Sequence, residues 1–344
     1  MISKLIQLAE HGLLIDSLIR IGIKRLCKNR LFKENDSSEL DKENKKQKWI
    51  QSMKISPIAL VPEKANEQHY EVPPSFFVAT LGSNLKYSSG YWPKHNMSLD
   101  ESEEAMLELC VQRADLVDGQ TILELGCGWG SLTFYISRKF PASKITAVSN
   151  SSDQRRYIEA KCEENNIKNI NVITADMNDF QTKETFDRVL SVEMFEHMRN
   201  YKKLLSRIDS WLNQEGKLFI HIFSHKSLVY PFEDNNEADW MAREFFSGGM
   251  MPSHDLLLYF QENLIIDKTW RISGSHYEKT SKAWLKKMDY NKKKVLEIFS
   301  KTYGEKNANL WFQRWRIFFM SCEKLFGFNK GSEWGISHYR FLKR

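Results

Sequence analysis

The residues from 122 to 130 read Ile-Leu-Glu-Leu-Gly-Cys-Gly-Trp-Gly, a short apolar run that ends in three glycines at alternate positions. The run predicts a buried β-strand, and the apolar side chains of Leu132, Tyr135 and Ile136 follow at helical spacing. Glycine permits a tight turn between the two elements and lets a ligand approach the backbone. This stretch therefore predicts an α/β fold with a ligand at the end of its first strand.

Further apolar runs follow, separated by segments of helical or polar pattern. They cover residues 144–148, 170–173, 186–191 and 216–221. Strands that alternate with helices are typical of a parallel sheet, whose ligands bind at the carboxyl ends of the strands. We therefore predict a Rossmann-like domain over residues 101–344, with an α-helical insertion over about 223–320 that covers the substrate.

The composition fits a globular protein. The chain has 344 residues, of which 42% are hydrophobic and 27% charged, and this excludes a disordered protein. No apolar stretch reaches the roughly 18 residues that a membrane span needs. The five scattered cysteines lack CxxC spacing, which argues against a zinc or disulfide framework and favours the reducing cytoplasm. The net charge of +6 is weak evidence for an anionic partner, and we predict neither bound nucleic acid nor a metal.

The first hundred residues predict a helical N-terminal region. Apolar residues recur at helical spacing over residues 2–30, which favours a helix packed on the main domain over the alternative, a helix on a membrane surface. The acids Glu10 and Asp16 argue against a cleavable signal peptide. Residues 33–54 are rich in Lys, Glu, Asp, Asn and Ser, and we interpret them as a charged linker or an exposed helix.

Three features favour S-adenosylmethionine over a dinucleotide as the ligand. The glycines Gly126, Gly128 and Gly130 are spaced GxGxG rather than GxGxxG. The carboxylate of Glu124 can meet the ammonium group of an amino-acid ligand, whereas it would repel a pyrophosphate. Asp176 follows the third strand, where it can accept a hydrogen bond from an adenine amino group.

The second strand ends without the acid that usually binds a ribose. Its last residue is Ser149, and Asn150 and Gln154 follow. The side chains of Asn150 and Gln154 can hydrogen-bond ribose hydroxyls instead. The alternative is that Asn150 only caps the next helix.

Two carboxylates and an imidazole, those of Glu193, Glu196 and His197, lie within five residues after the fourth strand. Glu193 and His197 are four positions apart and would share one face of a helical turn. A histidine with a pKa of about 6.5 beside a carboxylate is suited to taking a proton from a substrate at neutral pH. The alternative is a helix start, where the helix dipole favours acids.

Several strings in order carry a family resemblance. They are Asn-Glu-Gln-His-Tyr-Glu-Val-Pro at 66–73, Leu-Lys-Tyr-Ser-Ser-Gly-Tyr-Trp at 85–92, the glycine motif, Val-Glu-Met-Phe-Glu-His-Met at 192–198, and the stretches 245–253 and 315–319. The chain resembles the coclaurine N-methyltransferase-like enzymes, a branch of the cyclopropane-fatty-acyl-phospholipid synthase superfamily. The resemblance implies a class I Rossmann-like methyltransferase that uses S-adenosylmethionine.

The resemblance also implies roles for single residues. Glu193 and His197 match the pair that deprotonates the amine in these N-methyltransferases, with Glu196 nearby. Trp315 and Phe318 match an aromatic substrate pocket, for which simple core packing is the alternative. The positions that match contacts with the donor are Tyr87, Ser88, Gly126, Asn150, Gln154, Asp176, Met177 and Val192.

Two branches of the superfamily can be compared at the reacting centre. Cyclopropane synthases bind bicarbonate with Cys, Glu, His and Tyr, and this chain keeps Glu196, His221 and Tyr277 but has Ser89 in place of the cysteine. It also has Glu193 where the synthases carry glycine, and an added acid suits a cationic amine and would repel bicarbonate.

These observations predict an N-methyltransferase for a small, aromatic or alkaloid-like amine. His221, Tyr277, Trp315 and Phe318 are its predicted substrate residues. We expect a monomer or homodimer in the cytoplasm. The alternatives are methylene transfer to lipid acyl chains and a donor-binding regulatory protein whose site is degenerate.

Overall fold

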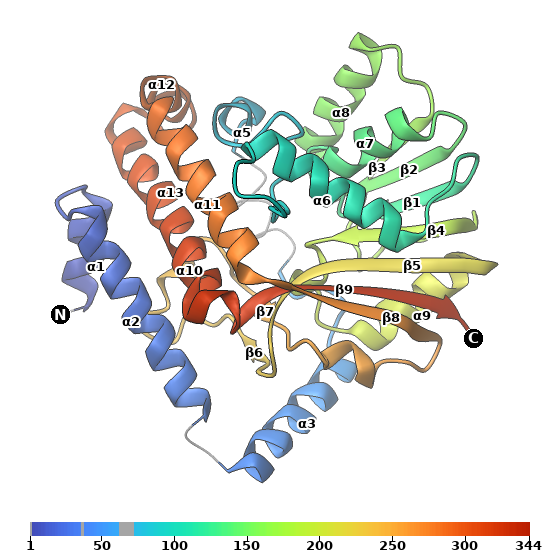
Figure 1. Ribbon diagram of the computed structural model, residues 1–344, viewed down its shortest axis with the longest axis horizontal. Helices are drawn as coiled ribbons and strands as arrows, with labels where there is room; N and C mark the ends of the chain where they lie inside the picture. Colours follow the sequence, from blue (N-terminus) through green and yellow to red (C-terminus); the bar gives the residue numbers. More distant parts are fainter. Residues whose placement is uncertain (1, 36–37, 62–71) are drawn as a thin grey trace.

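The computed structural model describes residues 2–35, 38–61 and 72–344, and its centre is a seven-stranded sheet (Figure 1). The strand order is β3-β2-β1-β4-β5-β9-β8, in which β1 to β5 run parallel and β9 runs antiparallel to both β5 and β8. The strands are β1 (Thr121–Leu125), β2 (Lys144–Ser149), β3 (Ile170–Thr174), β4 (Phe186–Val192), β5 (Leu212–His225), β8 (Leu264–Ser273) and β9 (Trp334–Lys343).

All five predicted strands are confirmed, and the α/β class with them, but two strands at one side of the sheet were not predicted. β8 is an edge strand that exposes Lys268 and Thr269, so it lacks a continuous apolar run. β9 lies between β8 and β5 and buries the polar side chains of Ser337 and His338. The sheet is therefore mixed, with its parallel part formed by the predicted strands.

Helices cover both faces of the sheet (Figure 1). α6 (Leu99–Ala114), α7 (Ser131–Lys139) and α8 (Ser152–Glu164) lie on one face, where they contact β5, β2 and β3. α9 (Tyr201–Trp211) lies on the other face and contacts β5, β8 and α3 (Glu39–Ile55). This arrangement leaves the carboxyl ends of the parallel strands open to a ligand.

The N-terminal helices pack on the C-terminal part of the chain. α1 (Ile2–Glu10) and α2 (Asp16–Asn35) contact α13 (Glu305–Phe326), and Arg316 Nη2 lies 2.9 Å from Asp16 Oδ2. In the 33–54 segment, residues 33–35 end α2 and residues 39–54 form most of α3, whereas Ser38 is not helical. Of the two interpretations of this segment, the exposed helix holds for most of α3.

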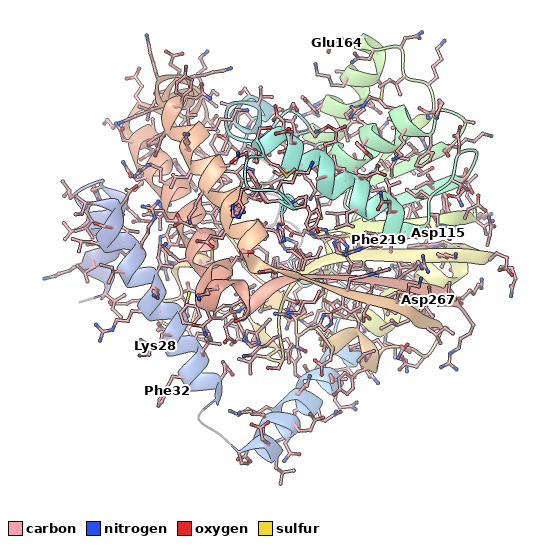
Figure 2. All side chains as sticks on the ribbon, viewed as in Figure 1. Lys28, Phe32, Asp115, Glu164, Phe219 and Asp267 are labelled. Atoms are coloured by element: carbon pink, nitrogen blue, oxygen red, sulfur yellow. The ribbon has the colours of Figure 1, made fainter. Side chains whose placement is uncertain are left out.

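The outer face of α2 carries exposed side chains of both apolar and basic character. Phe32 is 70% exposed, and Lys28 lies nearby on the same helix (Figure 2). Within the described ranges, no helix is long and apolar enough to cross a membrane. The expected packing of the N-terminal helices on the rest of the chain is confirmed, and whether their exposed face also contacts a membrane surface is not tested.

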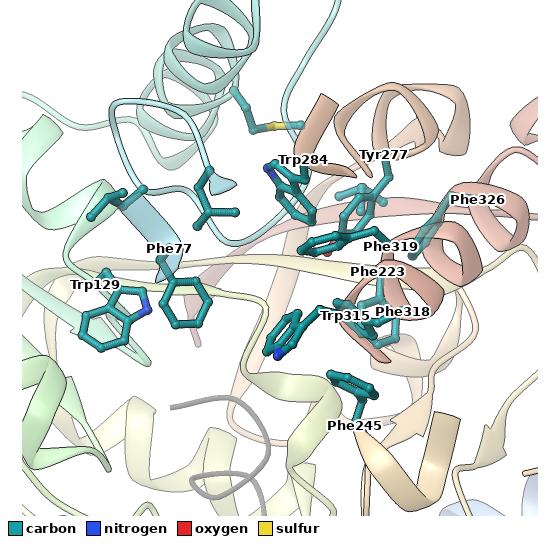
Figure 3. Packing of buried hydrophobic residues seen from close by; sticks show 14 of the residues in the cluster. Phe77, Trp129, Phe223, Phe245, Tyr277, Trp284, Trp315, Phe318, Phe319 and Phe326 are labelled. Carbon is teal, nitrogen blue, oxygen red and sulfur yellow. The ribbon is translucent and has the colours of Figure 1, made fainter. Parts of the chain in front are cut away.

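The segment from about residue 223 to 320 combines helices with sheet. It holds α10 (Trp240–Glu244), α11 (Gly274–Tyr290), α12 (Lys292–Tyr303) and most of α13, but also β8, so it is not purely helical. Aromatic side chains from α11 and α13 pack with Phe77 in one buried cluster (Figure 3). The short elements are α5 (Pro74–Thr80), β6 (Tyr230–Pro231), β7 (Met250–Met251), η2 (Phe195–His197), η3 (Leu256–Tyr259) and η4 (Phe328–Gly331).

Candidate active site

A cleft opens at the carboxyl ends of the parallel strands. Its wall includes seven of the residues predicted to bind the donor and two of the residues predicted to be catalytic, Glu193 and His197. The seven donor residues are Gly126, Gly128, Ser149, Asn150, Gln154, Asp176 and Met177. Of the string at 66–73, which carried part of the resemblance, residues 66–71 lie outside the described residues.

The glycine loop between β1 and α7 forms one wall of the cleft. Gly126, Gly128 and Gly130 have φ angles of 78°, 54° and 81°, which side-chain-bearing residues rarely adopt. A Cβ atom on Gly126 would lie 2.8 Å from Cβ of Met194, whereas a Cβ on Gly128 would meet no atom within 4 Å. Gly128 therefore leaves backbone open to the cleft, as a ligand that approaches the main chain requires.

The end of β2 offers polar groups to the same cleft. Ser149 Oγ donates to Gln154 Oε1 at 2.6 Å, and Gln154 Nε2 is buried with no hydrogen-bond partner among the described residues. The N-cap of α8 is Ser151, whose side chain accepts from Gln154 N, so the alternative reading of Asn150 as the helix cap is wrong. The unpaired amide donor of Gln154 on the wall of the cleft fits a ligand rich in hydroxyl groups.

Replacing Gly128 with Ala raises the dissociation constant of S-adenosylmethionine at least about tenfold, because the methyl group enters the space next to the backbone. Gly119 is the matched control, since its φ is 86° and its Cβ would also meet no atom within 4 Å, but it lies in a turn before β1. Gly119→Ala carries the same backbone strain without altering donor affinity. Titration calorimetry measures both, and equal affinities in the two variants would contradict this assignment.

The other residues predicted to bind the donor are not among the described residues that line the cleft. Glu124 is buried and accepts from Thr133 Oγ1 at 2.5 Å, and burial raises the pKa of its carboxyl to about 7. Gly130 is the N-cap of α7, and Ser88 is buried and accepts from Lys86. Two more complete the set, the half-buried Tyr87 and the last residue of β4, Val192.

The carboxylate of Glu193 lies where four segments of the chain meet. The Tyr277 hydroxyl of α11 donates to Glu193 Oε2 at 2.9 Å, and the backbone N–H of Ser89 donates to the same carboxylate. His221 Nε2 of β5 lies 3.4 Å from Glu193 Oε1. The buried ammonium group of Lys86 also attracts this carboxylate. The carboxylate, which lines the cleft, is thus held in place from several sides.

Glu193 and His197 do not share a helical face, so that expectation is wrong. Glu193 has a φ of 48°, and only the short 3-10 helix η2 follows it. Both side chains nevertheless line the same cleft, because the left-handed turn at Glu193 changes the direction of the backbone after β4. The His197 ring stacks on Phe246 with ring centroids 4.7 Å apart.

Burial reverses the expected order of acidity among these groups. It raises the pKa of Glu193 to about 7, against the attraction of Lys86. Burial and the neighbouring Glu193 raise the pKa of Glu196 well above its ordinary value. Burial lowers the pKa of His197 to about 4. The expected imidazole that titrates near neutrality is therefore absent at His197, and Glu193 is the group that does so.

The predicted substrate aromatics Trp315 and Phe318 do not line the cleft. Both belong to the buried cluster of Figure 3, where Trp315 is 0% exposed and packs on Phe245 with ring centroids 5.1 Å apart. Tyr277 connects this cluster to the cleft, since its ring stacks on Phe326 at 4.2 Å while its hydroxyl reaches Glu193.

Two groups at the centre were missed by the sequence reasoning. Lys86 is 2% exposed, and burial lowers its pKa, yet a lysine in a polar string carries no signal of burial. Ser89 acts through its backbone N–H, which every residue except proline has, so its residue type does not mark it as part of the site. Both lie in the conspicuous string 85–92, which is the one pattern that could have pointed to them.

The comparisons with known proteins agree with this geometry. Residues 61–332 match the model of the mycolic acid cyclopropane synthetase family. The chain is 37% identical to (S)-coclaurine N-methyltransferase of Papaver somniferum, over 99% of this chain and 98% of that one. It is 35% identical to pavine N-methyltransferase of Thalictrum flavum subsp. glaucum, over 100% of this chain and 97% of that one.

A solved structure extends the match to three dimensions. A crystal structure of coclaurine N-methyltransferase bound to N-methylheliamine and SAH superposes with a TM-score of 0.95, at 35% identity and 99% coverage of both chains. The open backbone at Gly128 and the orphaned Gln154 Nε2 fit a donor of this kind. The chain belongs to the mycolic acid cyclopropane synthetase family, in its coclaurine N-methyltransferase-like branch, and is an S-adenosylmethionine-dependent methyltransferase.

Proposed function

We propose that the protein transfers a methyl group from S-adenosylmethionine to the nitrogen of a small aromatic or alkaloid-like amine. The observation that carries the proposal is the carboxylate of Glu193, which lines the donor cleft and is connected through Tyr277 to a buried aromatic cluster. A buried carboxylate attracts a cationic amine, and the rings provide apolar surface for the rest of the molecule. The N-methyltransferases to which the chain is similar support the same reaction.

The chain's own residues hold and align the reactants. The backbone at Gly126 and Gly128 would cradle the donor, with Asn150 and Gln154 at its ribose and Asp176 at its adenine. When bound, S-adenosylmethionine supplies the methyl group, and its C–S bond breaks with the electron pair left on sulfur. Alignment of the nitrogen with that methyl group and exclusion of water are the main contributions of the protein. In this proposal, the supporting positions around the donor are Tyr87, Ser88, Glu124, Gly130, Ser149, Met177 and Val192.

Glu193 is the proton acceptor in this proposal. An amine attacks only when its nitrogen lone pair is free, and after attack a secondary amine must lose its N–H proton. With a pKa of about 7, Glu193 is ionised in a useful fraction at neutral pH and can take that proton. His197 stays neutral and offers a ring nitrogen to the amine or to a water molecule. The raised pKa of Glu196 disfavours a second negative charge beside Glu193.

The substrate's apolar part would lie against the aromatic cluster. Tyr277 joins that cluster to Glu193, and His221 lies on the opposite side of the carboxylate. Trp315 and Phe318 extend the aromatic surface behind Tyr277. In this proposal, the amine nitrogen points to Glu193 and the rings of the substrate face these side chains.

Methylene transfer to lipid acyl chains is less well supported. By the family resemblance, Glu196, His221 and Tyr277 would hold bicarbonate in that reaction. Here the Tyr277 hydroxyl and the His221 ring contact the carboxylate of Glu193, which is itself an anion at that position. A second anion beside it would be repelled. The intact acids also argue against a donor-binding protein without activity.

A transfer assay tests the proposed function. The protein is incubated with donor labelled in its methyl group, a panel of secondary arylalkylamines and cyclic benzylic amines, and phospholipid vesicles with unsaturated acyl chains. We expect the labelled methyl group on the nitrogen of at least one amine and no label in the lipid. Label in the acyl chains, or in no product while donor still binds, would contradict it.

The rate falls on the acid side of neutrality because Glu193 must be a carboxylate. Its pKa is raised above the ordinary value, so the ionised form is lost as the pH falls through about 7. Below that value, kcat/KM falls about tenfold for each unit of pH. A pH profile measured with two amines of different basicity checks this. The midpoint stays in place if Glu193 sets it, and a midpoint that follows the basicity of the amine would contradict this origin.

We also propose a cytoplasmic location for the enzyme. All five cysteines are free thiols, and Cys27, Cys110 and Cys127 are buried, which suits a reducing compartment. A monomer or a homodimer remains our expectation for the oligomeric state, and light scattering measures it directly.

A further inference from the structure

A row of polar side chains crosses the sheet from the candidate active site to α6. His221 of β5 and His338 of β9 are directly paired across the two antiparallel strands, and both are 0% exposed. His338 Nε2 lies 2.9 Å from His221 Nδ1, and Arg113 Nη1 of α6 lies 2.8 Å from His338 Nδ1. At the other end, His221 Nε2 faces Glu193 Oε1 at 3.4 Å. Four side chains from four segments thus form one continuous chain.

Arg113 determines which nitrogen donates and which accepts in each hydrogen bond of this row. A guanidinium group only donates hydrogen bonds, so His338 Nδ1 must accept from Arg113 and carry no hydrogen. The hydrogen of a neutral His338 ring then lies on Nε2 and is donated to His221 Nδ1. The hydrogen of His221 in turn lies on Nε2 and points at the carboxylate of Glu193.

We propose that Arg113 and His338 are positioning residues, which act through His221 to fix its Nε2–H tautomer and so direct a permanent hydrogen-bond donor at Glu193. This inference rests on the proposed role of Glu193 as the proton acceptor. Because Arg113 cannot accept a proton, the chain does not carry the proton of the amine away through the sheet. Its effect is to hold the carboxylate in one orientation and to favour its ionised form.

Burial supports two neutral rings. It lowers the pKa of both His221 and His338 well below the ordinary value, and Lys86 and Arg113 lower both further. A protonated ring would donate from both nitrogens, and two facing donors cannot form the close contact of 2.9 Å as a hydrogen bond. Neutral rings, each with a fixed acceptor and a fixed donor, match the observed contacts.

A metal ion is the competing explanation for the same cluster. Cys110, His221 and His338 offer ligand atoms within 4.8 Å of one another. However, Arg113 and Lys86 bring two cationic groups to this pocket, and burial raises the pKa of Cys110 to about 11, so the thiol keeps its proton. The positive neighbours and the protonated thiol disfavour the binding of a cation at this cluster. The row of hydrogen bonds from Arg113 to Glu193 is compatible with both.

The chain acts on Glu193 among several other charged and titratable groups. Those that face this carboxylate from every side are Lys86, Cys110, Glu196, His221, Tyr277 and Cys322. Only His221 is reached by the chain from Arg113, so changes at Arg113 or His338 leave the contacts with Tyr277 and Lys86 in place. A change in the titration of Glu193 in such variants therefore reports on the hydrogen bond from His221.

Nuclear magnetic resonance of the full-length protein, labelled with isotopes in histidine, measures the tautomers without reference to activity. Spectra of His221→Gln and His338→Gln assign the two rings. We expect both rings to be neutral with hydrogen on Nε2. Hydrogen on Nδ1 of either ring, or a metal bound to either, would overturn the proposal. If the tautomers are as expected but no amine is methylated, the row of hydrogen bonds from Arg113 to His221 is confirmed and the proposed function is wrong.

Variants test the link to Glu193. Arg113→Met removes the fixed donor, His338→Leu breaks the chain but keeps the arginine charge, and Arg113→Lys and His338→Gln retain the needed donors and acceptors. The first two should raise the midpoint of carboxyl titration at Glu193 by about one pH unit, the scale of one hydrogen bond to an ionised group. The two conservative variants should titrate like the wild type. A shift in Arg113→Met without one in His338→Leu would show a distant charge effect and overturn the chain, as would no shift in either.

Discussion

Replacing Glu193 with Gln lowers kcat by at least about 10², the range that a positioned proton acceptor contributes. Gln has nearly the shape of Glu but no negative charge, so it cannot take the proton from the amine. It also presents an NH₂ group where the Tyr277 hydroxyl and the Ser89 N–H now donate. Donor affinity should stay near that of the wild type, because the cradle at Gly126 and Gly128 is unchanged. Steady-state kinetics and titration calorimetry measure the two effects separately.

Glu103→Gln is the matched control for this prediction. Glu103 is also a buried carboxyl whose pKa burial raises to about 7, but it accepts from the backbone N–H groups of Gly82 and Asn84 away from the cleft. This control should lower stability and leave kcat near that of the wild type. Equal kcat values for Glu193→Gln and the wild type would remove Glu193 from the proton transfer. A kcat that falls equally in both variants would point to a general effect of buried charge.

Replacing Trp315 with Ala lowers the free energy of unfolding by about 3–5 kcal/mol, the range for a large aromatic side chain removed from a core. Trp315 is 0% exposed, and its ring lies 4.6 Å from Phe76 and 5.1 Å from Phe245. The cavity would lie within the buried cluster of Figure 3, where the rings around Trp315 come from separate segments of the chain and cannot all shift to fill it. Urea denaturation followed by circular dichroism measures the change.

Trp311 provides a matched control one turn earlier on the same helix. It is half-buried, stacks on Tyr303 at 4.4 Å and lies under the guanidinium of Arg314. Trp311→Ala should cost only about 1 kcal/mol, the scale of one aromatic pair. If both substitutions cost the same small amount, Trp315 is not the core residue that its packing indicates. In that event, a role limited to the substrate would account for it better.

The fold was predictable where local patterns decide it and not where distant segments do. The five parallel strands are short apolar runs between helices, and each was recognised from its own residues. β8 and β9 pair with the sheet through contacts far apart in the chain, and β9 buries Ser337 and His338. Hydrophobicity does not mark such strands, because their polar groups are satisfied by partners that the sequence does not reveal.

The site was predictable in its residues more than in its electrostatics. Glu193 and His197 were identified, but their backbone is a left-handed turn followed by a 3-10 helix rather than one helical face. Burial then exchanges the expected roles, since it raises the pKa of Glu193 and lowers that of His197. Desolvation depends on every group packed around a side chain. Residue type and spacing alone therefore indicated His197 as the group that titrates near neutral pH, whereas the structure indicates Glu193.

A structure of the enzyme with SAH and a bound amine tests the central claim most directly. We expect the amine nitrogen to lie within hydrogen-bond distance of the Glu193 carboxylate and to face the sulfur of SAH, with the substrate's rings on the side of Tyr277. A nitrogen bound away from Glu193, with the carboxylate still held by Tyr277 and His221 alone, would contradict it.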